Sequence, residues 1–197
     1  METEGRTWGV QAARDYKTGY LTGALMTDGQ FGGFYPDTLI LLRNKKEDLA
    51  GLSEKVAGYA TDIAPHQQLI PAPKVLSYAD GSYGIESVAL RDAVTHLIAK
   101  ITKEPLPALS ECSSRFYEGF LSGAIEVTGH MDKGRIWISE SPNLRPSIGA
   151  FFVELLKQLD CESVCTGCAV VIAGRKECEK FLMRLNNPEL SMKFANL

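Results

Sequence analysis

The sequence predicts an α+β protein of two pseudo-symmetric halves, and three observations support this fold class. The stretch GYLTGALMTDG, residues 19–29, returns as GFLSGAIEVTG, residues 119–129, at an offset of 100 residues. The same order of helical, strand and hairpin patterns follows each stretch. The chain has 197 residues, of which 45% are hydrophobic and 23% charged, and this suffices for two half-domains with a shared core.

The first half continues with four predicted elements after its glycine-containing helix. Glycines and Pro36 indicate a turn that leads into a strand, apolar residues at helical spacing indicate a helix, and the Asp80-Gly81 pair indicates a β-hairpin. A short helix closes the half. In chain order these elements occupy residues 31–45, 45–63, 68–90 and 90–103.

The second half repeats this order. Its predicted elements are a strand at residues 133–139, an amphipathic helix at 143–160, a hairpin at 161–174 that turns at Thr166-Gly167, and a final helix at 175–185. Each half is therefore an αββαββα unit with antiparallel strands. We place the N-terminal half at residues 1–103, a linker with two prolines at 104–112, and the C-terminal half at 113–197.

Both repeated stretches keep two glycines four residues apart, although each glycine costs a helix about 1 kcal/mol against alanine. The spacing puts Gly19 and Gly23 on one helix face, and Gly119 and Gly123 on another, where the missing side chains let two backbones come close. We therefore predict that the two helices pack on each other at a central interface. Because the duplication supplies internally the interface that a homodimer would use, we expect a monomer.

Composition excludes several classes of protein. The formal net charge of −3 and the pI near 5.7 give no general attraction to nucleic acid, so such binding must rest on local charge. No apolar run approaches the roughly 20 residues of a membrane helix, and the polar start METEGRTW does not resemble a signal peptide. We expect a cytoplasmic protein, or one of an organellar matrix.

Four of the five cysteines are clustered late in the chain. Their spacing admits a structural zinc site, with thiolates as ligands, or a disulfide between strands. Free cysteine is among the most buried residue types, and we therefore predict that these side chains pack in the core and hold no zinc. The four are Cys161, Cys165, Cys168 and Cys178.

The repeated stretches resemble a known motif. LTGALMTDG at residues 21–29 resembles the nine-residue LAGLIDADG motif, and LSGAIEVTG at 121–129 resembles a second copy. With the αββαββα order repeated, the chain is similar to the single-chain LAGLIDADG homing endonucleases of archaeal introns and of organelles, over about residues 16–185. The resemblance implies that the motif helices form the central interface and that the two sheets form a DNA-binding saddle, which reads a long site in the major groove.

The resemblance also implies a catalytic site. In that family the penultimate motif residue is an acid, and the paired carboxylates bind divalent metal ions at the scissile phosphates. Asp28 matches the first acid, as a catalytic residue and ligand of Mg²⁺, and Thr128 replaces the second. A hydroxyl is a weaker ligand for Mg²⁺ than a carboxylate, and Glu126 lies about 200° away around the helix. We therefore expect a hydrolase whose DNA cleavage is impaired to nicking or lost.

Basic and aromatic residues on the predicted strands are the candidates for contacts with phosphates and bases. Acids in the same segments repel phosphates, so a solvated sheet face is the alternative interpretation. We expect His130, which follows the second motif, to be an exposed turn residue. The candidates for nucleic-acid binding are Arg43, Lys45, Lys46, Lys74, Tyr78, Tyr83, Lys133, Arg135, Trp137 and Arg175.

Two other functions are alternatives to DNA recognition. An RNA maturase that assists the folding of its host intron would not need the acids. A degenerate relative would serve as a non-catalytic binding module, and the acidic pI favours that version. The sequence carries no phosphate-binding loop of the P-loop type, no dinucleotide fingerprint and no nucleophile elbow.

Overall fold

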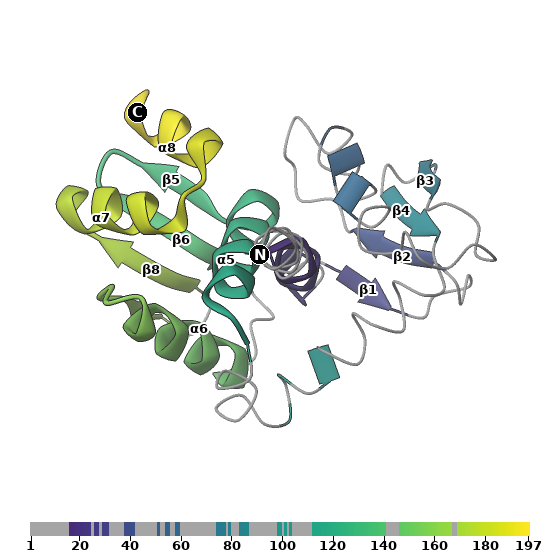
Figure 1. Cartoon of the computed structure of the whole chain (residues 1–197), viewed down its shortest axis with the longest axis horizontal. Helices are drawn as coiled ribbons and strands as arrows, with labels where there is room; N and C mark the ends of the chain where they lie inside the picture. The colour runs from purple at the N-terminus through teal and green to yellow at the C-terminus, as the bar shows by residue number, and fades with distance from the viewer. Residues whose placement is uncertain are drawn as a thin grey trace, which may run out of the picture.

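Two four-stranded antiparallel sheets with the same strand order build the two halves of the molecule (Figure 1). The first has the order β1-β2-β4-β3, from Gly29–Phe31 (β1), Thr38–Leu41 (β2), Lys74–Ser77 (β3) and Tyr83–Glu86 (β4). The second has the order β5-β6-β8-β7, from His130–Asp132 (β5), Arg135–Glu140 (β6), Val164–Cys165 (β7) and Ala169–Ala173 (β8). The predicted α+β class with two pseudo-symmetric halves is confirmed.

The computed structural model describes residues 16–24, 26–27, 29–31, 38–41, 51, 54–55, 58–59, 74–77, 79, 83–86, 98–99, 101, 103, 112–140, 146–166 and 169–197. Residues 16–24 and 26–27 are helical, and we call them the first motif helix. Further helical residues of the N-terminal half fall within the helices predicted at 45–63 and 90–103. The helices of the C-terminal half are Ser114–Val127 (α5), Pro146–Gln158 (α6), Arg175–Leu185 (α7) and Pro188–Ala195 (α8).

Both predicted hairpins are present. Strands β3 and β4 pair with Ser77 opposite Tyr83, and residue 79 lies in a turn between them, while Asp80 and Gly81 lie outside the described residues. Strands β7 and β8 pair with Val164 opposite Val171, and the Thr166 N–H donates to the Ala169 carbonyl at 2.8 Å to close the turn.

Two local features differ from the sequence prediction. His130 is the first residue of β5 and not a turn residue. Helix α8 lies beyond the last predicted helix, and it begins where the Asn187 side chain accepts a hydrogen bond from the Leu190 N–H at 3.1 Å, with Pro188 as the first helical residue. An Asn-Pro start of this kind is a recognised helix signal.

The core of the C-terminal half lies against one face of the second sheet. Ile136, Ile138, Val170 and Ile172 alternate along β6 and β8 to this side, and buried residues of all four helices join them in one apolar cluster. The side chains between them, such as Trp137 and Val171, project to the opposite face, which is partly exposed. We call that opposite side the outer face of the second sheet.

The predicted packing of the first motif helix against α5 is confirmed, and it depends on glycine. A Cβ atom on Gly19 would lie under 3.0 Å from the carbonyl oxygen of Phe116, and one on Gly119 would lie equally close to that of Tyr16. Gly23 faces Phe120, and Gly123 faces Tyr20, in the same way. Each contact thus has its counterpart 100 residues away, as a pseudo-twofold axis between the helices requires. Figure 1 shows the helix pair between the two sheets.

None of the helices in the described part of the chain is both long and apolar enough to span a membrane.

Candidate nucleic-acid interface and metal position

Thr128, at the position of the second motif acid, is the C-cap of α5 and has a structural role. Its side chain is buried, with 6% of the residue exposed, and its hydroxyl donates to the Ala124 carbonyl at 3.2 Å. Its backbone N–H donates to the same carbonyl at 3.0 Å. The hydroxyl therefore binds the last turn of its own helix and is not presented to a ligand.

The position of the first motif acid, Asp28, lies outside the described residues. The residue before it, Thr27, donates its hydroxyl to the Gly23 carbonyl at 2.9 Å, and β1 begins directly after it at Gly29. Among the residues that the structure describes, no group of three or more His, Cys, Asp or Glu side chains is arranged to hold a metal ion.

Glu126 accepts hydrogen bonds from three different parts of the chain. The Tyr20 hydroxyl donates to Oε2 at 2.6 Å, Lys55 Nζ donates to the same atom at 2.8 Å, and Asn187 Nδ2 donates to Oε1 at 3.1 Å. Lys55 also pairs with Glu189 of α8 at 2.9 Å. We call these five residues the interface cluster, because they join the N-terminal half to α5 and α8.

The contact between Tyr20 and Glu126 is replaced by apolar residues at the pseudo-symmetric positions. The residues 100 positions from Tyr20 and Glu126 are Phe120 and Met26. Phe120 is fully buried and lies 5.4 Å, centroid to centroid, from the ring of Phe152, and Met26 packs against the apolar core. The two halves therefore share a backbone plan but differ in the chemistry beside the motif helices.

Burial and charge perturb the titration of this cluster. Burial, followed by the negative charge of Glu126, raises the pKa of the Tyr20 hydroxyl above its ordinary value. Burial by itself lowers the pKa of Lys55, but the hydrogen bond and charge of Glu126, together with Glu189, raise it on balance. The cluster therefore holds a protonated tyrosine and a charged lysine at neutral pH.

The outer face of the second sheet carries a row of aromatic and apolar side chains that crosses all four strands. His130 is opposite Trp137, Trp137 is opposite Val171, and Val171 is opposite Val164. Residues directly opposite in an antiparallel sheet project to the same face. The rings of His130 and Trp137 stack at 4.0 Å with an interplanar angle of 14°. We call these four residues the apolar row.

A second row lies one pleat along the same face. Asp132 is opposite Arg135, and Arg135 is opposite Ala173. The Arg135 guanidinium carbon lies 5.8 Å from the centroid of the Trp137 ring, and Asp132 Oδ1 accepts from the Gly134 N–H at 3.0 Å in the β5–β6 turn. We call Asp132, Arg135 and Ala173 the charged row.

The candidate nucleic-acid contacts separate into four groups. Lys133, Arg135 and Trp137 lie together on β6 and the turn before it. Arg175 is a helix residue, not a strand residue: it begins α7, where it pairs with Glu179 at 3.0 Å. Lys74 and Tyr83 lie in β3 and β4, with side chains outside the described part, and the rest lie outside the described residues altogether: Arg43, Lys45, Lys46 and Tyr78.

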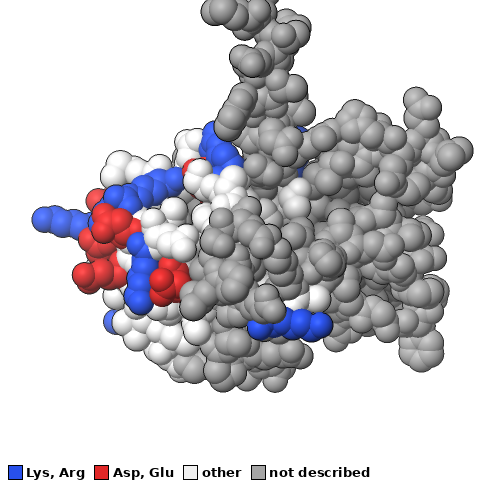
Figure 2. Space-filling model, turned by 60° about the horizontal axis from the view of Figure 1, so that its bottom comes forward, with Lys and Arg blue, Asp and Glu red and all other residues white. Residues whose placement is uncertain are grey.

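Acids accompany several of the described basic side chains. Lys180 and Arg184 of α7 both contact Asp160, at 3.1 and 3.0 Å, and Arg184 also donates to the Leu159 carbonyl. The hydrogen bonds and charges of Lys180 and Arg184 hold the pKa of Asp160 below its ordinary value. In the view of Figure 2, the basic and acidic side chains of the described residues are interleaved and not separated by sign.

The clustered cysteines divide between core and surface. Cys161 and Cys178 are buried in the apolar cluster, as the packing prediction requires, and burial raises the pKa of both thiols. Cys165 is exposed on β7, so the packing prediction is wrong for it. Cys168 lies outside the described residues.

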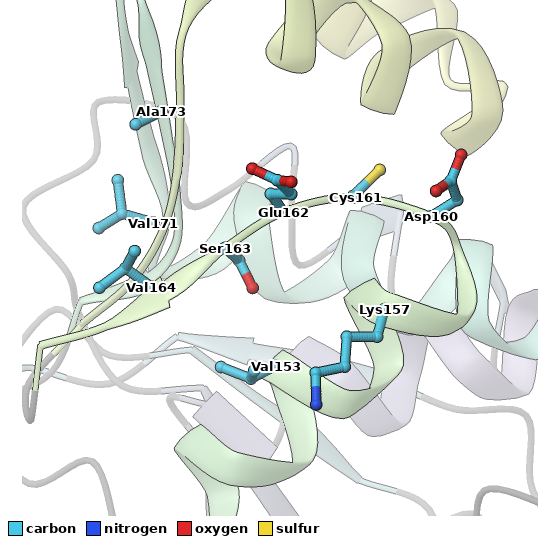
Figure 3. Close-up of a pocket in the computed structure, with 9 residues that line it drawn as sticks. All are labelled: Val153, Lys157, Asp160, Cys161, Glu162, Ser163, Val164, Val171 and Ala173. Atoms are coloured by element: carbon cyan, nitrogen blue, oxygen red, sulfur yellow. The ribbon is translucent and has the colours of Figure 1, made fainter.

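A pocket of about 460 Å³ lies beside strands β7 and β8, between them and the end of α6. Figure 3 shows Val164, Val171 and Ala173 on the strand side and Val153 and Lys157 on the helix. Two members of the apolar row thus also line this pocket.

The structure is similar to crystal structures of the homing endonuclease I-DmoI. A variant of I-DmoI in complex with its target DNA in the presence of 2 mM Mg has a TM-score of 0.61 and 15% sequence identity, covering 89% of this chain and 98% of that chain. I-DmoI in complex with DNA and Mn has a TM-score of 0.60 and 15% identity, covering 87% of this chain and 97% of that chain.

A protein of another kind shares the fold. Full-length DUF199/WhiA from Thermatoga maritima has a TM-score of 0.57 and 11% identity, covering 93% of this chain and 59% of that chain. No family model matches the sequence, and a search of curated proteins finds no match. The N-terminal LAGLIDADG domain of DUF199/WhiA has a TM-score of 0.53 and 12% identity, covering 88% of this chain and 82% of that chain. The structural comparisons therefore show that this chain has the LAGLIDADG fold, with two similar halves in a single polypeptide.

Proposed function

We propose that this chain binds duplex DNA along the outer faces of its two sheets, as a homing-endonuclease-like reader of a long site with two unlike halves, and that it does not cut both strands. The likeness to I-DmoI structures solved with target DNA supports the binding surface. The unequal chemistry of the two halves supports unlike half-sites. We also propose a monomer of halves 1–103 and 113–197, joined by residues 104–112.

The position of Thr128 is the observation that carries the loss of double-strand cleavage. Hydrolysis by paired metal ions needs anionic oxygen ligands from both motif helices. Thr128 offers a buried hydroxyl already bonded to Ala124, and the Glu126 carboxylate is already engaged by Tyr20, Lys55 and Asn187. The described residues of the second motif therefore do not fit a magnesium ion, and any Mg²⁺-dependent cut would depend on Asp28 and affect one strand.

The experiment that tests this function is selection from a randomised duplex library with the full chain, in Ca²⁺ and at low salt, where charge contacts are strongest. Recovery of a long, two-part site is the expected result. The recovered duplex is then incubated with Mg²⁺, and nicks on each strand are mapped on a denaturing gel. We expect cuts on one strand or none.

Matched variants separate binding from cleavage. Asp28→Asn keeps the size of the side chain, so it should abolish any nick while leaving the dissociation constant in Ca²⁺ within a few-fold of the original. Recovery of no duplex would contradict the proposal, and structured RNA and protein partners would be tested in its place. Equal cuts on both strands would contradict the assignment of Thr128.

A further inference from the structure

The valine end of the apolar row is unsuited to the common kind of base recognition, whereas His130 and Trp137 carry ring N–H groups. Sequence is usually read in the major groove through hydrogen bonds from Arg, Asn or Gln to base edges. Val171 and Val164 have no polar side-chain atoms, and Val164 is 61% exposed, one of the most exposed large apolar residues in the described part of the chain. A surface of this chemistry contacts apolar groups, and the apolar group on the major-groove edge of DNA is the methyl group at C5 of thymine.

The dimensions of the row match a groove. Neighbouring strands of a sheet lie about 4.8 Å apart, so four strands give a row about 14 Å long, close to the roughly 12 Å width of the major groove. The stack of His130 on Trp137 at 4.0 Å holds the indole in place at one end. At the other end lie Val164, which is exposed, and Val171, which is partly exposed.

Charge beside the row favours DNA as the occupant. Arg135 of the charged row and Lys133 in the adjacent turn are both exposed, and they supply positive charge for phosphates on the rim of the groove. The one acid of the charged row, Asp132, accepts a hydrogen bond from the Gly134 N–H. Two exposed cations, Arg135 and Lys133, therefore lie beside the His130 and Trp137 end of the apolar row.

We propose that the apolar row reads the C5-methyl groups of pyrimidines in the half-site bound by the C-terminal half, with Val171 and Val164 as the specificity-determining residues. This inference rests on the proposed binding of duplex DNA. Thymine is one source of such a methyl group and 5-methylcytosine is another, and the test distinguishes them.

The experiment uses the full chain and a duplex recovered by the selection described above. Each fixed thymine is first replaced by uracil, which lacks only the C5-methyl group. At the same position, a cytosine–guanine pair is then compared with a 5-methylcytosine–guanine pair, which differs from it only by that methyl group. Dissociation constants are measured in Ca²⁺. We expect uracil to weaken binding about fourfold for each methyl group contacted by the row. We expect 5-methylcytosine to bind more tightly than unmethylated cytosine at the same position.

Val171→Thr is the decisive variant, because it replaces one methyl group by a hydroxyl and keeps a β-branched strand residue. At the base pair that residue 171 contacts, the dissociation constant for the uracil duplex divided by that for the thymine duplex should fall from about four to about one. Arg135→Gln is the control: it should weaken binding to every duplex and leave that ratio unchanged. Circular dichroism and thermal unfolding show that both variants are folded.

The outcomes separate this inference from the proposed function. Failure to recover any duplex overturns both. Recovery of a site in which uracil binds as tightly as thymine at every position overturns the methyl-reading inference alone. A uracil effect that persists in Val171→Thr and in Val164→Thr also overturns it, because the methyl group is then read elsewhere.

Discussion

The Tyr20 hydroxyl donates a 2.6 Å hydrogen bond to Glu126 Oε2, so a polar contact joins the two motif helices in addition to their glycine contacts. Tyr20 is fully buried, and the Glu126 side chain is 14% exposed. Lys55 donates to the same oxygen at 2.8 Å. A buried acceptor shared by several donors is costly to remove because each donor is left without its partner.

Glu126→Leu should therefore lower the free energy of unfolding by about 3 kcal/mol, since it leaves the Tyr20 hydroxyl and the Asn187 amide without an acceptor. Urea denaturation measures the change. Glu179→Leu, which breaks the exposed pair with Arg175, is the control and should cost less than about 1 kcal/mol. Equal costs for the two variants would contradict a stabilising role of the interface cluster.

A triple variant tests whether polarity or packing holds this contact. Tyr20→Phe, Lys55→Leu and Glu126→Met together introduce the residue types found 100 positions away in the chain. We expect the triple variant to recover much of the stability lost in Glu126→Leu, because it also removes the Tyr20 hydroxyl and the Lys55 charge, so that only the Asn187 amide still lacks its acceptor. A triple variant less stable than Glu126→Leu in urea would show that the site cannot accept apolar packing.

Gly23→Ala should destabilise the protein by about 3 kcal/mol, because the new Cβ would lie under 3.0 Å from the Phe120 carbonyl oxygen, a backbone atom of a packed helix. Gly58→Ala is the matched control: residue 58 is also helical, and a Cβ there meets nothing within 4 Å. The control should stabilise by up to about 1 kcal/mol through helix propensity. Similar urea midpoints for the two variants would contradict the close contact of the helices.

Thr128→Asp should lower the melting temperature in a chelator, because it places a carboxylate at a position that is 6% exposed. We expect Mg²⁺ to raise the melting temperature of this variant more than that of the original chain, as the restored acid and Asp28 would together bind the ion. The response should vanish in the double variant with Asp28→Asn. Differential scanning calorimetry measures all three, and an absent response in Thr128→Asp would show that the metal position is lost.

Buried cysteines should resist modification in the folded chain. Burial raises the pKa of Cys178 from its ordinary 9.0 to about 11, so the thiol stays protonated and shielded at pH 8, whereas Cys165 is exposed. Iodoacetamide at pH 8, followed by peptide mass spectrometry, should modify Cys165 first and leave Cys161 and Cys178 unmodified. Rapid modification of Cys178 without unfolding would contradict its burial.

The raised pKa of Cys178 predicts how the stability of the folded chain depends on pH. Cys178 titrates higher in the folded chain than in the unfolded chain, so its contribution is fully present below pH 9 and is lost as the pH rises to about 11. Urea midpoints at pH 8, 9, 10 and 11 should decrease less in Cys178→Ala than in the original chain. A parallel decrease in both would contradict the assignment.

Hydrophobic periodicity and turn residues were sufficient to predict the helices and strands that carry the candidate nucleic-acid interface. The spacing of Gly19 and Gly23 predicted a helix contact, since only backbone geometry is involved. Helix α8 was missed although Asn187 and Pro188 carry a readable start signal, because the last periodic segment ends just before them.

Side-chain partners could not be predicted in the same way. Glu126 bonds to Tyr20 across 106 residues and to Lys55 across 71, and no local pattern encodes such distances. The apolar row depends on strand register, which the sequence of one strand does not determine. The inward direction of Thr128 follows from its place at the end of α5, where its hydroxyl meets the Ala124 carbonyl.

The glycine contacts have a consequence for how proteins of this kind are detected. The two motif copies share the glycines that form the helix contact, which are Gly19, Gly23, Gly119 and Gly123. The copies differ at residues 26–28 and 126–128, where the catalytic acids of the motif would lie. The similarity between the two copies therefore reflects the packing of the two helices and not a catalytic function. A chain can lose a cleavage residue and still match the motif, so a motif match alone does not identify a nuclease.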